Sequence, residues 1–114
     1  TNLGRTDDIR VNKALSFIQE HSGTIIQVDE VVMEAGVSRR KLETLFKKRI
    51  NSTINEEIIK ARVEHILKLL RETDIPEFEI ALKLGYSNST NLARLIRRET
   101  GMLPREYRRQ FRNW

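Results

Sequence analysis

The chain contains an internal repeat, in which the same helix, turn and basic helix occur twice. In the first copy, Val32-x-x-x-Gly36-Val37-Ser38 is followed by Leu42-x-x-Leu45-Phe46-Lys47-Lys48-Arg49. The matching patterns Ala81-x-x-x-Gly85-Tyr86-Ser87 and Leu92-x-x-Leu95-Ile96-Arg97-Arg98-Glu99 lie 49 and 50 residues later, so the second turn holds one extra residue. The repeat constrains the fold more than either copy alone, because the chain must build one kind of unit twice.

Each copy predicts two helices broken at a glycine. Gly36 can adopt the positive φ that a tight turn needs. The helix from Ser38 to Arg49 carries six basic residues against one acid, and its apolar residues recur at helical spacing. One face can therefore pack while the other presents cations. A helix–glycine–helix unit with a basic second helix is how a helix-turn-helix enters the DNA major groove.

The rest of the chain predicts an all-α fold of about seven helices, because strand signals are few. We expect one domain over residues 1–114, with helix-turn-helix subdomains at about 7–50 and 74–112. A linking helix at about 53–72, ~27 Å long, joins them. Further expectations concern helix ends and anchors: Asp7 as the first N-cap, Gly23, Asn51 and Gly101 as helix ends, Pro76 and Pro104 in first turns, and Tyr107 and Phe111 as apolar anchors of the last helix.

Composition excludes several functional classes. The chain has 114 residues, a net charge of +5 and no cysteine, which favours anionic partners and excludes disulfides and thiolate metal sites. No apolar run is long enough to span a membrane. His21 and His65 have no partner at metal-ligand spacing, so we expect no metal, no cofactor and no catalytic site. The chain begins without a methionine, and we expect it to be a piece of a longer protein.

Two such units, a linking helix and the ending Gly-x-x-Pro-x-x-Tyr-Arg resemble the DNA-binding domain of the AraC/XylS transcription regulators. The residues that carry the resemblance are Gly36-Val37-Ser38, Leu42-x-x-Leu45-Phe46-Lys47, Ile80-Ala81-x-x-Leu84-Gly85-Tyr86 and Gly101-Met102-Leu103-Pro104-Arg105-Glu106-Tyr107-Arg108. The resemblance covers nearly the whole chain and looks closest to the xylose-regulator branch. Asn51, Leu92 and Ile96 depart from the family pattern but keep the chemistry of their positions.

The resemblance and the helical register together place the candidate DNA contacts. Residues expected to face base edges are Arg39, Arg40, Glu43, Thr44, Ser89, Thr90, Asn91 and Arg94. Residues expected to hold phosphates are Lys47, Lys48, Arg97, Arg98 and Arg105, helped by backbone amides at the helix starts.

Some of these residues have a second interpretation. Glu43 can accept a hydrogen bond from cytosine N4, or form an i,i+4 ion pair with Arg39 or Lys47. Thr44 can touch a thymine methyl or be a neutral surface residue. The last arginines of the chain, Arg105, Arg108, Arg109 and Arg112, also fit a merely solvated tail.

The predicted function is sequence-specific binding of promoter or operator DNA by a bacterial regulator, in the cytoplasm at the nucleoid. The resemblance implies a sensor domain outside this chain, and it makes RNA polymerase a candidate partner and activation a candidate role. The residues themselves do not distinguish activation from repression. The alternative function is a helical protein-interaction module whose basic faces meet an acidic partner.

Overall fold

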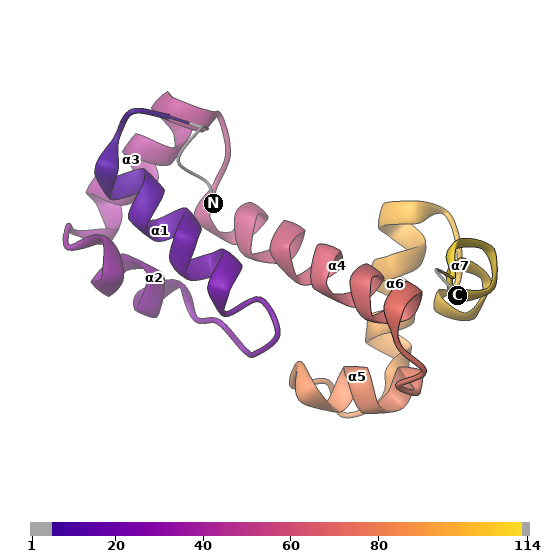
Figure 1. Ribbon diagram of the computed structural model, residues 1–114. Helices are drawn as coiled ribbons and strands as arrows, with labels where there is room; N and C mark the ends of the chain where they lie inside the picture. Colours follow the sequence, from indigo (N-terminus) through magenta and orange to yellow (C-terminus); the bar gives the residue numbers. More distant parts are fainter. Residues whose placement is uncertain (1–5, 113–114) are drawn as a thin grey trace. The chain divides into compact units, whose positions relative to one another are not determined.

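The computed structural model describes residues 6–112, drawn as a ribbon in Figure 1. Its helices are α1 (Ile9–Glu20), α2 (Val28–Ala35), α3 (Arg39–Ile50), α4 (Ile54–Glu72), α5 (Glu77–Lys83), α6 (Ser89–Thr100) and α7 (Pro104–Phe111). No strand occurs among the described residues, and the predicted all-α fold is confirmed. Within that part of the chain, no helix is both long and apolar enough to cross a membrane.

The chain divides into two compact units. Among the described residues, the first holds 6–22 and Ile26–Ala61, and the second holds Gly23–Ile25 and 62–112. Helix α4 runs without a break from the first unit into the second. The linking helix is thus shared between the units, and the short segment Gly23–Ile25 belongs to the second unit. The division into two helix-turn-helix subdomains and a linking helix stays a prediction.

The first unit is built from α1, α2, α3 and the first part of α4. Its apolar residues recur at helical spacing, so each helix contributes one stripe to a common core. The core consists of Val11, Ala14, Leu15, Ile18, Ile26, Val31, Ala35, Leu42, Leu45, Phe46, Ile54, Ile58 and Ala61. The turn between α2 and α3 depends on Gly36, which has the predicted positive φ of 75°.

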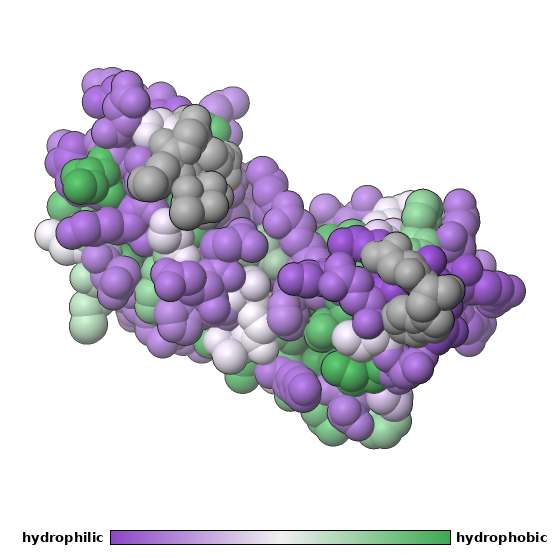
Figure 2. Space-filling view, viewed as in Figure 1, coloured by the Kyte–Doolittle hydropathy of each residue, from purple (hydrophilic) through white to green (hydrophobic). Residues whose placement is uncertain are grey.

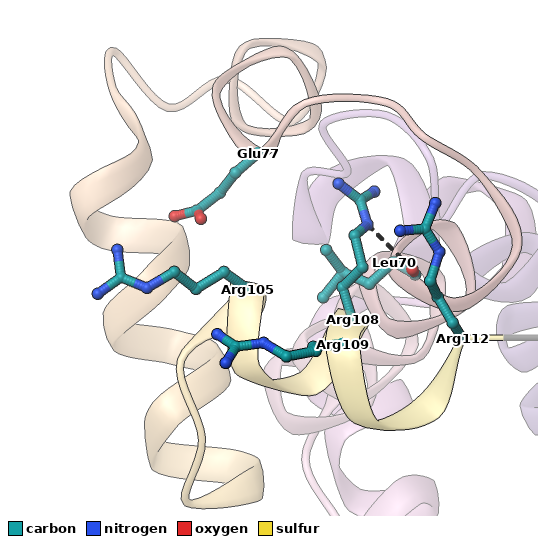
Figure 3. Close-up of a pocket in the computed structure, with 6 residues that line it drawn as sticks. All are labelled: Leu70, Glu77, Arg105, Arg108, Arg109 and Arg112. Carbon is teal, nitrogen blue, oxygen red and sulfur yellow. Dashed lines mark hydrogen bonds between the residues drawn. The ribbon is translucent and has the colours of Figure 1, made fainter.

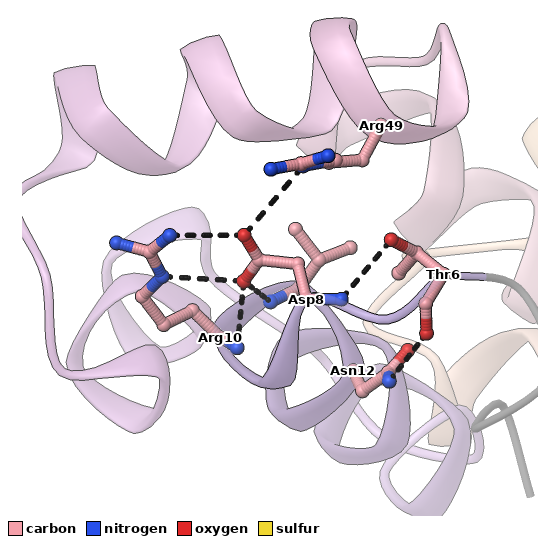
Figure 4. A network of polar contacts seen from close by, with 6 residues as sticks. Thr6, Asp8, Arg10, Asn12 and Arg49 are labelled. Carbon is pink, nitrogen blue, oxygen red and sulfur yellow. Dashed lines mark hydrogen bonds and ion pairs between the residues drawn. The ribbon is translucent and has the colours of Figure 1, made fainter.

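Helix α1 begins one residue later than predicted, because its N-cap is Asp8 and not Asp7. The Asp8 carboxylate accepts hydrogen bonds from the backbone N–H of Arg10 at 2.9 Å and from that of Val11 at 3.4 Å. It also accepts two from the Arg10 guanidinium, at 3.2 and 2.9 Å, and lies 3.8 Å from Arg49 of α3 (Figure 4). These bonds, chiefly the side-chain bond from Arg10, lower the pKa of Asp8 from 3.8 to about 2.

We expect Asp8→Ala to lower the free energy of unfolding by about 1–2 kcal/mol at pH 7, because the N-cap bonds of α1 are removed. The folded pKa lies below the unfolded one, so the charged carboxylate stabilises the fold above about pH 4. This contribution disappears as the pH falls toward 2. Urea unfolding should therefore show the difference between the wild type and the variant shrinking over that range. The exposed Asp7 is the matched control; an equal loss in Asp7→Ala would contradict the assignment.

Gly23 does not end α1 in the left-handed conformation, in contrast to the prediction. The C-cap is His21, and the glycines with positive φ are Gly36, Gly85 and Gly101 among the described residues. A Cβ at Gly23 would lie 2.9 Å from two ring atoms of His65. Glycine is therefore needed here for a close approach to the His65 ring, and not for its backbone freedom.

The second unit is built from the rest of α4 together with α5, α6 and α7. Its buried apolar residues are Val63, Ile66, Leu70, Ile80, Ala81, Leu84, Leu92, Ile96 and Pro104. Gly85 precedes the second basic helix with a φ of 85°, and a Cβ on it would lie 2.6 Å from Cδ1 of Ile25. Its positive φ therefore favours glycine, and a side chain here would also require the Ile25 side chain to move.

Two details of this unit differ from prediction, and one agrees with it. Pro76 occupies the N-cap of α5 and so lies just outside the first turn. Phe111 is 41% exposed, so it does not anchor the last helix. Its ring centroid lies 4.7 Å from that of Tyr107. Tyr107 is half-buried, and its hydroxyl accepts a hydrogen bond from Arg71 at 2.9 Å, so the last helix is held through this residue.

Arg108 of α7 forms hydrogen bonds with backbone carbonyl groups at the C-terminal end of α4. Its guanidinium donates to the carbonyl oxygens of Leu70 at 3.1 Å, Leu69 at 3.5 Å and Ile75 at 2.7 Å. The last carbonyls of a helix have no partner within the helix. Arg108 is therefore a structural residue, which corrects the interpretation of it as part of a solvated tail.

Candidate nucleic-acid interface

Helix α3 is fixed at both ends by its own sequence. The Ser38 hydroxyl accepts a hydrogen bond from the backbone N–H of Lys41 at 3.2 Å, as expected of an N-cap. At the other end Asn51 has a left-handed φ of 51°, also as predicted. The helix therefore presents a defined set of residues to solvent.

The outer face of α3 follows from its buried side. The buried residues are Leu42, Leu45 and Phe46. At about 100° of rotation per residue, the direction opposite to them belongs to Arg40, Thr44 and Lys47. All three are exposed. Lys48 is also exposed and lies on one flank of this face, and the acidic Glu43 lies on the other.

Glu43 forms the ion pair that one of its two interpretations predicts. Its carboxylate lies 3.3 Å from Nε of Arg39, and Arg39 also lies 3.8 Å from Asp29 of α2. All three side chains are at least half exposed, so these pairs contribute little stability. They hold Arg39 and Glu43 to one flank of α3, and base contacts by these two residues remain predictions.

Thr44 has a hydroxyl that is already used within the helix. Its Oγ1 donates a hydrogen bond to the carbonyl oxygen of Arg40 at 2.9 Å. The polar end of this exposed side chain is thus turned back to the backbone. What remains for a partner is chiefly the γ-methyl group.

Helix α6 presents a second face of the same kind. Asn88 is its N-cap and accepts from the backbone N–H of Thr90 at 2.8 Å, while Gly101 ends it with a φ of 77°. Leu92 and Ile96 are its buried residues. Opposite them lie three exposed or half-exposed residues: Thr90, Arg94 and Arg97.

Two other predicted contacts flank this face. Asn91 is exposed, and its Oδ1 accepts a hydrogen bond from Arg94 at 3.4 Å. Ser89 is only half exposed. The structure therefore brings Thr90, Asn91 and Arg94 together at the start of α6, with Ser89 at their edge.

The predicted phosphate contacts of α3 and α6 are all exposed. Arg98 lies 3.3 Å from Glu99, whereas Lys47, Lys48 and Arg97 form no ion pair with any residue of 6–112. Hydrophilic residues cover most of the face of the molecule seen in Figure 2. An anionic partner can therefore bind these cations without first breaking strong interactions within the protein.

Arg105 lies apart from the other predicted phosphate contacts. It lines a pocket of about 410 Å³ with Leu70, Glu77, Arg108, Arg109 and Arg112, shown in Figure 3. Burial raises the pKa of Glu77 above its ordinary value, although Arg105 and Arg108 act against the rise. Arg112 pairs with Asp74 at the rim of this region. The role of Arg105 in holding phosphate remains a prediction, and the structure shows it beside a carboxylate.

Sequence reasoning missed Asn88 and Asp29. Asn88 directly precedes the second basic helix, where asparagine is a preferred N-cap, so its signal was present. The contact of Asp29 with Arg39 could not be found in this way, because it joins side chains of two different helices.

Comparisons with known proteins agree with this geometry. The family model described as "Helix-turn-helix domain" matches residues 31–110. The chain is 33% identical to an uncharacterized HTH-type transcriptional regulator in the cgkA 5' region of Pseudoalteromonas carrageenovora, over 89% of this chain and 60% of that protein. It is 31% identical to the regulatory protein SoxS of Salmonella typhimurium, over 86% of this chain and 92% of that protein.

Solved structures show the same fold. The xylose-binding transcription activator xylR matches with a TM-score of 0.86 and 29% identity, over 93% of this chain and 28% of its own. A regulator of Chromobacterium violaceum with an AraC-type DNA-binding domain matches with a TM-score of 0.82 and 26% identity, over 91% of this chain and 93% of its own. Assignment to the xylose-regulator branch remains a prediction, since SoxS is about as similar in sequence. The chain belongs to the AraC/XylS family of helix-turn-helix transcription regulators.

Proposed function

We propose that this chain binds double-stranded DNA sequence-specifically as part of a bacterial transcription regulator, with α3 and α6 entering successive major grooves. The observation that carries the proposal is the double occurrence of one arrangement. Each of the two helices buries an apolar stripe and turns an arginine, a threonine and a further cation to solvent. An exposed helix of this kind fits the major groove.

The exposed residues divide into two roles in this proposal. Arg40 and Arg94 can each give a bidentate contact to guanine, and Glu43, Thr44, Thr90 and Asn91 can add contacts to neighbouring bases. Arg39 and Ser89 stand beside them. Lys47, Lys48, Arg97, Arg98 and Arg105 orient the protein by holding phosphates, which carries no sequence information. The function is binding, without catalysis.

The whole regulator is proposed to be larger than this chain. The chain spans 28% of the xylR structure and 60% of the Pseudoalteromonas relative, and a sensor domain would occupy the remainder. RNA polymerase is a candidate partner of a DNA-bound activator. We place the protein in the bacterial cytoplasm, at the nucleoid.

Selection of bound sites from random duplex DNA tests the proposal. The expected result is a preferred sequence with two separated segments, bound more tightly than competitor DNA. A module that uses its basic faces for an acidic protein would bind all duplexes about equally. Enrichment of no sequence would overturn the proposal in favour of that alternative.

We expect Arg40→Ala and Arg94→Ala each to cost about 1–3 kcal/mol on the preferred site and to relax the preference at one position. The matched control is Lys48→Ala, which should weaken all sequences alike, because it removes a phosphate contact. Titrations on the preferred site and on scrambled duplexes separate the two effects. A change of preferred bases in Lys48→Ala, with none in Arg40→Ala, would reverse the assigned roles.

A further inference from the structure

The outer faces of α3 and α6 carry the same residue types in exchanged order. At the offset of 50 residues, Arg40 corresponds to Thr90, and Thr44 corresponds to Arg94. Both pairs lie opposite the buried stripe of their helix and reach solvent. The arginine stands in the first turn of α3 and one turn later in α6.

These side chains differ in the contacts that they make within their own helix. Arg40 forms no ion pair within residues 6–112, so its guanidinium is available to a base. The Thr44 hydroxyl is held by the Arg40 carbonyl oxygen, which leaves a methyl group outward. In α6, Arg94 donates a hydrogen bond to Oδ1 of Asn91 at 3.4 Å, an exposed contact within the helix.

The displacement of the arginine has a consequence on the DNA. One helical turn is about 5.4 Å of helix. In zinc fingers, side chains three to four residues apart on the helix in the major groove contact successive bases. An arginine moved by one turn therefore reaches a base pair about one to two steps further along the groove.

We propose that α3 and α6 read their guanines in different places: α3 from its first turn and α6 from its second, with the Thr44 methyl meeting a thymine beside the α3 guanine. The inference rests on the proposed function and deepens it, because it states what distinguishes the two contacted segments. The two segments of the preferred site therefore differ in where their guanine lies. In the α3 segment the guanine lies opposite the first turn of the helix, and in the α6 segment it lies opposite the second turn.

Exchanging the two residues in α3 tests the inference. The variant is Arg40→Thr combined with Thr44→Arg, which leaves the net charge unchanged. The preferred site of this variant is selected from random duplex DNA. It is then compared with the wild-type site, with the segment contacted by α6 as the common reference. The guanine of the α3 segment should move by about one to two base pairs, while the α6 segment stays the same.

The matched control is the reverse exchange in α6, Thr90→Arg with Arg94→Thr, which should move only the other guanine. Circular dichroism verifies the fold of each variant. If one variant fails to fold, the other poses the same question. A guanine that stays in place or disappears, while the unaltered segment is still selected, overturns the inference and leaves DNA binding intact. A wild-type chain that selects no sequence would instead overturn the proposed function.

The thymine contact has its own test, with uracil in place of thymine in the α3 segment. Removal of one buried methyl group, about 0.8 kcal/mol, should weaken wild-type binding about fourfold. Thr44→Ser keeps the hydroxyl and lacks the methyl group, so for this variant the same DNA change should have less than about a twofold effect. An equal reduction for both proteins would contradict the contact.

Discussion

The affinity of this chain for its DNA site is expected to fall by about 10³–10⁵-fold between 50 and 200 mM salt. The reason is the release of counterions from about 6–10 phosphates, each neutralised by a lysine or arginine. The exposed cations of α3 and α6 are expected to supply part of these contacts, since several of them form no ion pair with another described residue. The measurement is a titration of affinity against salt concentration, which should give a straight line on logarithmic axes.

Variants sharpen this expectation. Lys47→Ala with Lys48→Ala should reduce the slope of that line by about two, or one for each phosphate that is no longer neutralised. Lys13→Ala is the control, because Lys13 is an exposed lysine on α1 and belongs to neither α3 nor α6. A nearly flat line for the wild type would refute DNA binding. A reduction of about one in the slope for Lys13→Ala, the same per charge removed as in the double variant, would show that only the net charge matters.

An insertion of about 5 bp between the two contacted DNA segments should reduce affinity to that of a single segment. About 10 bp make one turn, so the insertion turns one segment to the far side of the duplex. Helix α4 has 19 residues, about 28 Å of helix, without glycine or proline. It cannot lengthen to follow the displaced segment.

The control for this experiment changes the intervening bases without changing their number, and it should preserve binding. A second control inserts the same 5 bp outside both segments. Undiminished affinity for the lengthened site would mean that only one helix reads DNA or that the two units are flexibly joined.

The sequence predicted the elements that depend on local signals. The bounds of α4 agree with prediction to within a residue, and α6 ends at Gly101 as predicted, because hydrophobic periodicity and helix-end residues act locally. The outer faces of both basic helices follow from the same periodicity. The candidate base contacts could therefore be placed on a surface, although their partners in DNA could not.

Two of the misses have a common physical cause in contacts between distant segments. Asp7 and Asp8 are adjacent acids with equal capping propensity, and only Asp8 meets Arg49. Gly23 was predicted to end α1 in the left-handed conformation. A sequence does not distinguish a glycine that is needed for a positive φ from one that is needed because a side chain would collide with a neighbour. The space at Gly23 is set by His65, far along the chain.

The dependence of α4 on Arg108 has a consequence for how the protein is made. The hydrogen bond from Arg108 to the Leu70 carbonyl oxygen joins residues 38 positions apart, and Arg108 belongs to the last helix of the described residues. The core of the first unit, in contrast, is complete at Ala61. Synthesis proceeds from the N-terminus, and compact units tend to fold as they emerge. The first unit is therefore expected to fold while the second is still being synthesised, and a chain cut before Arg108 should lose the hydrogen bonds that this residue makes to the end of α4.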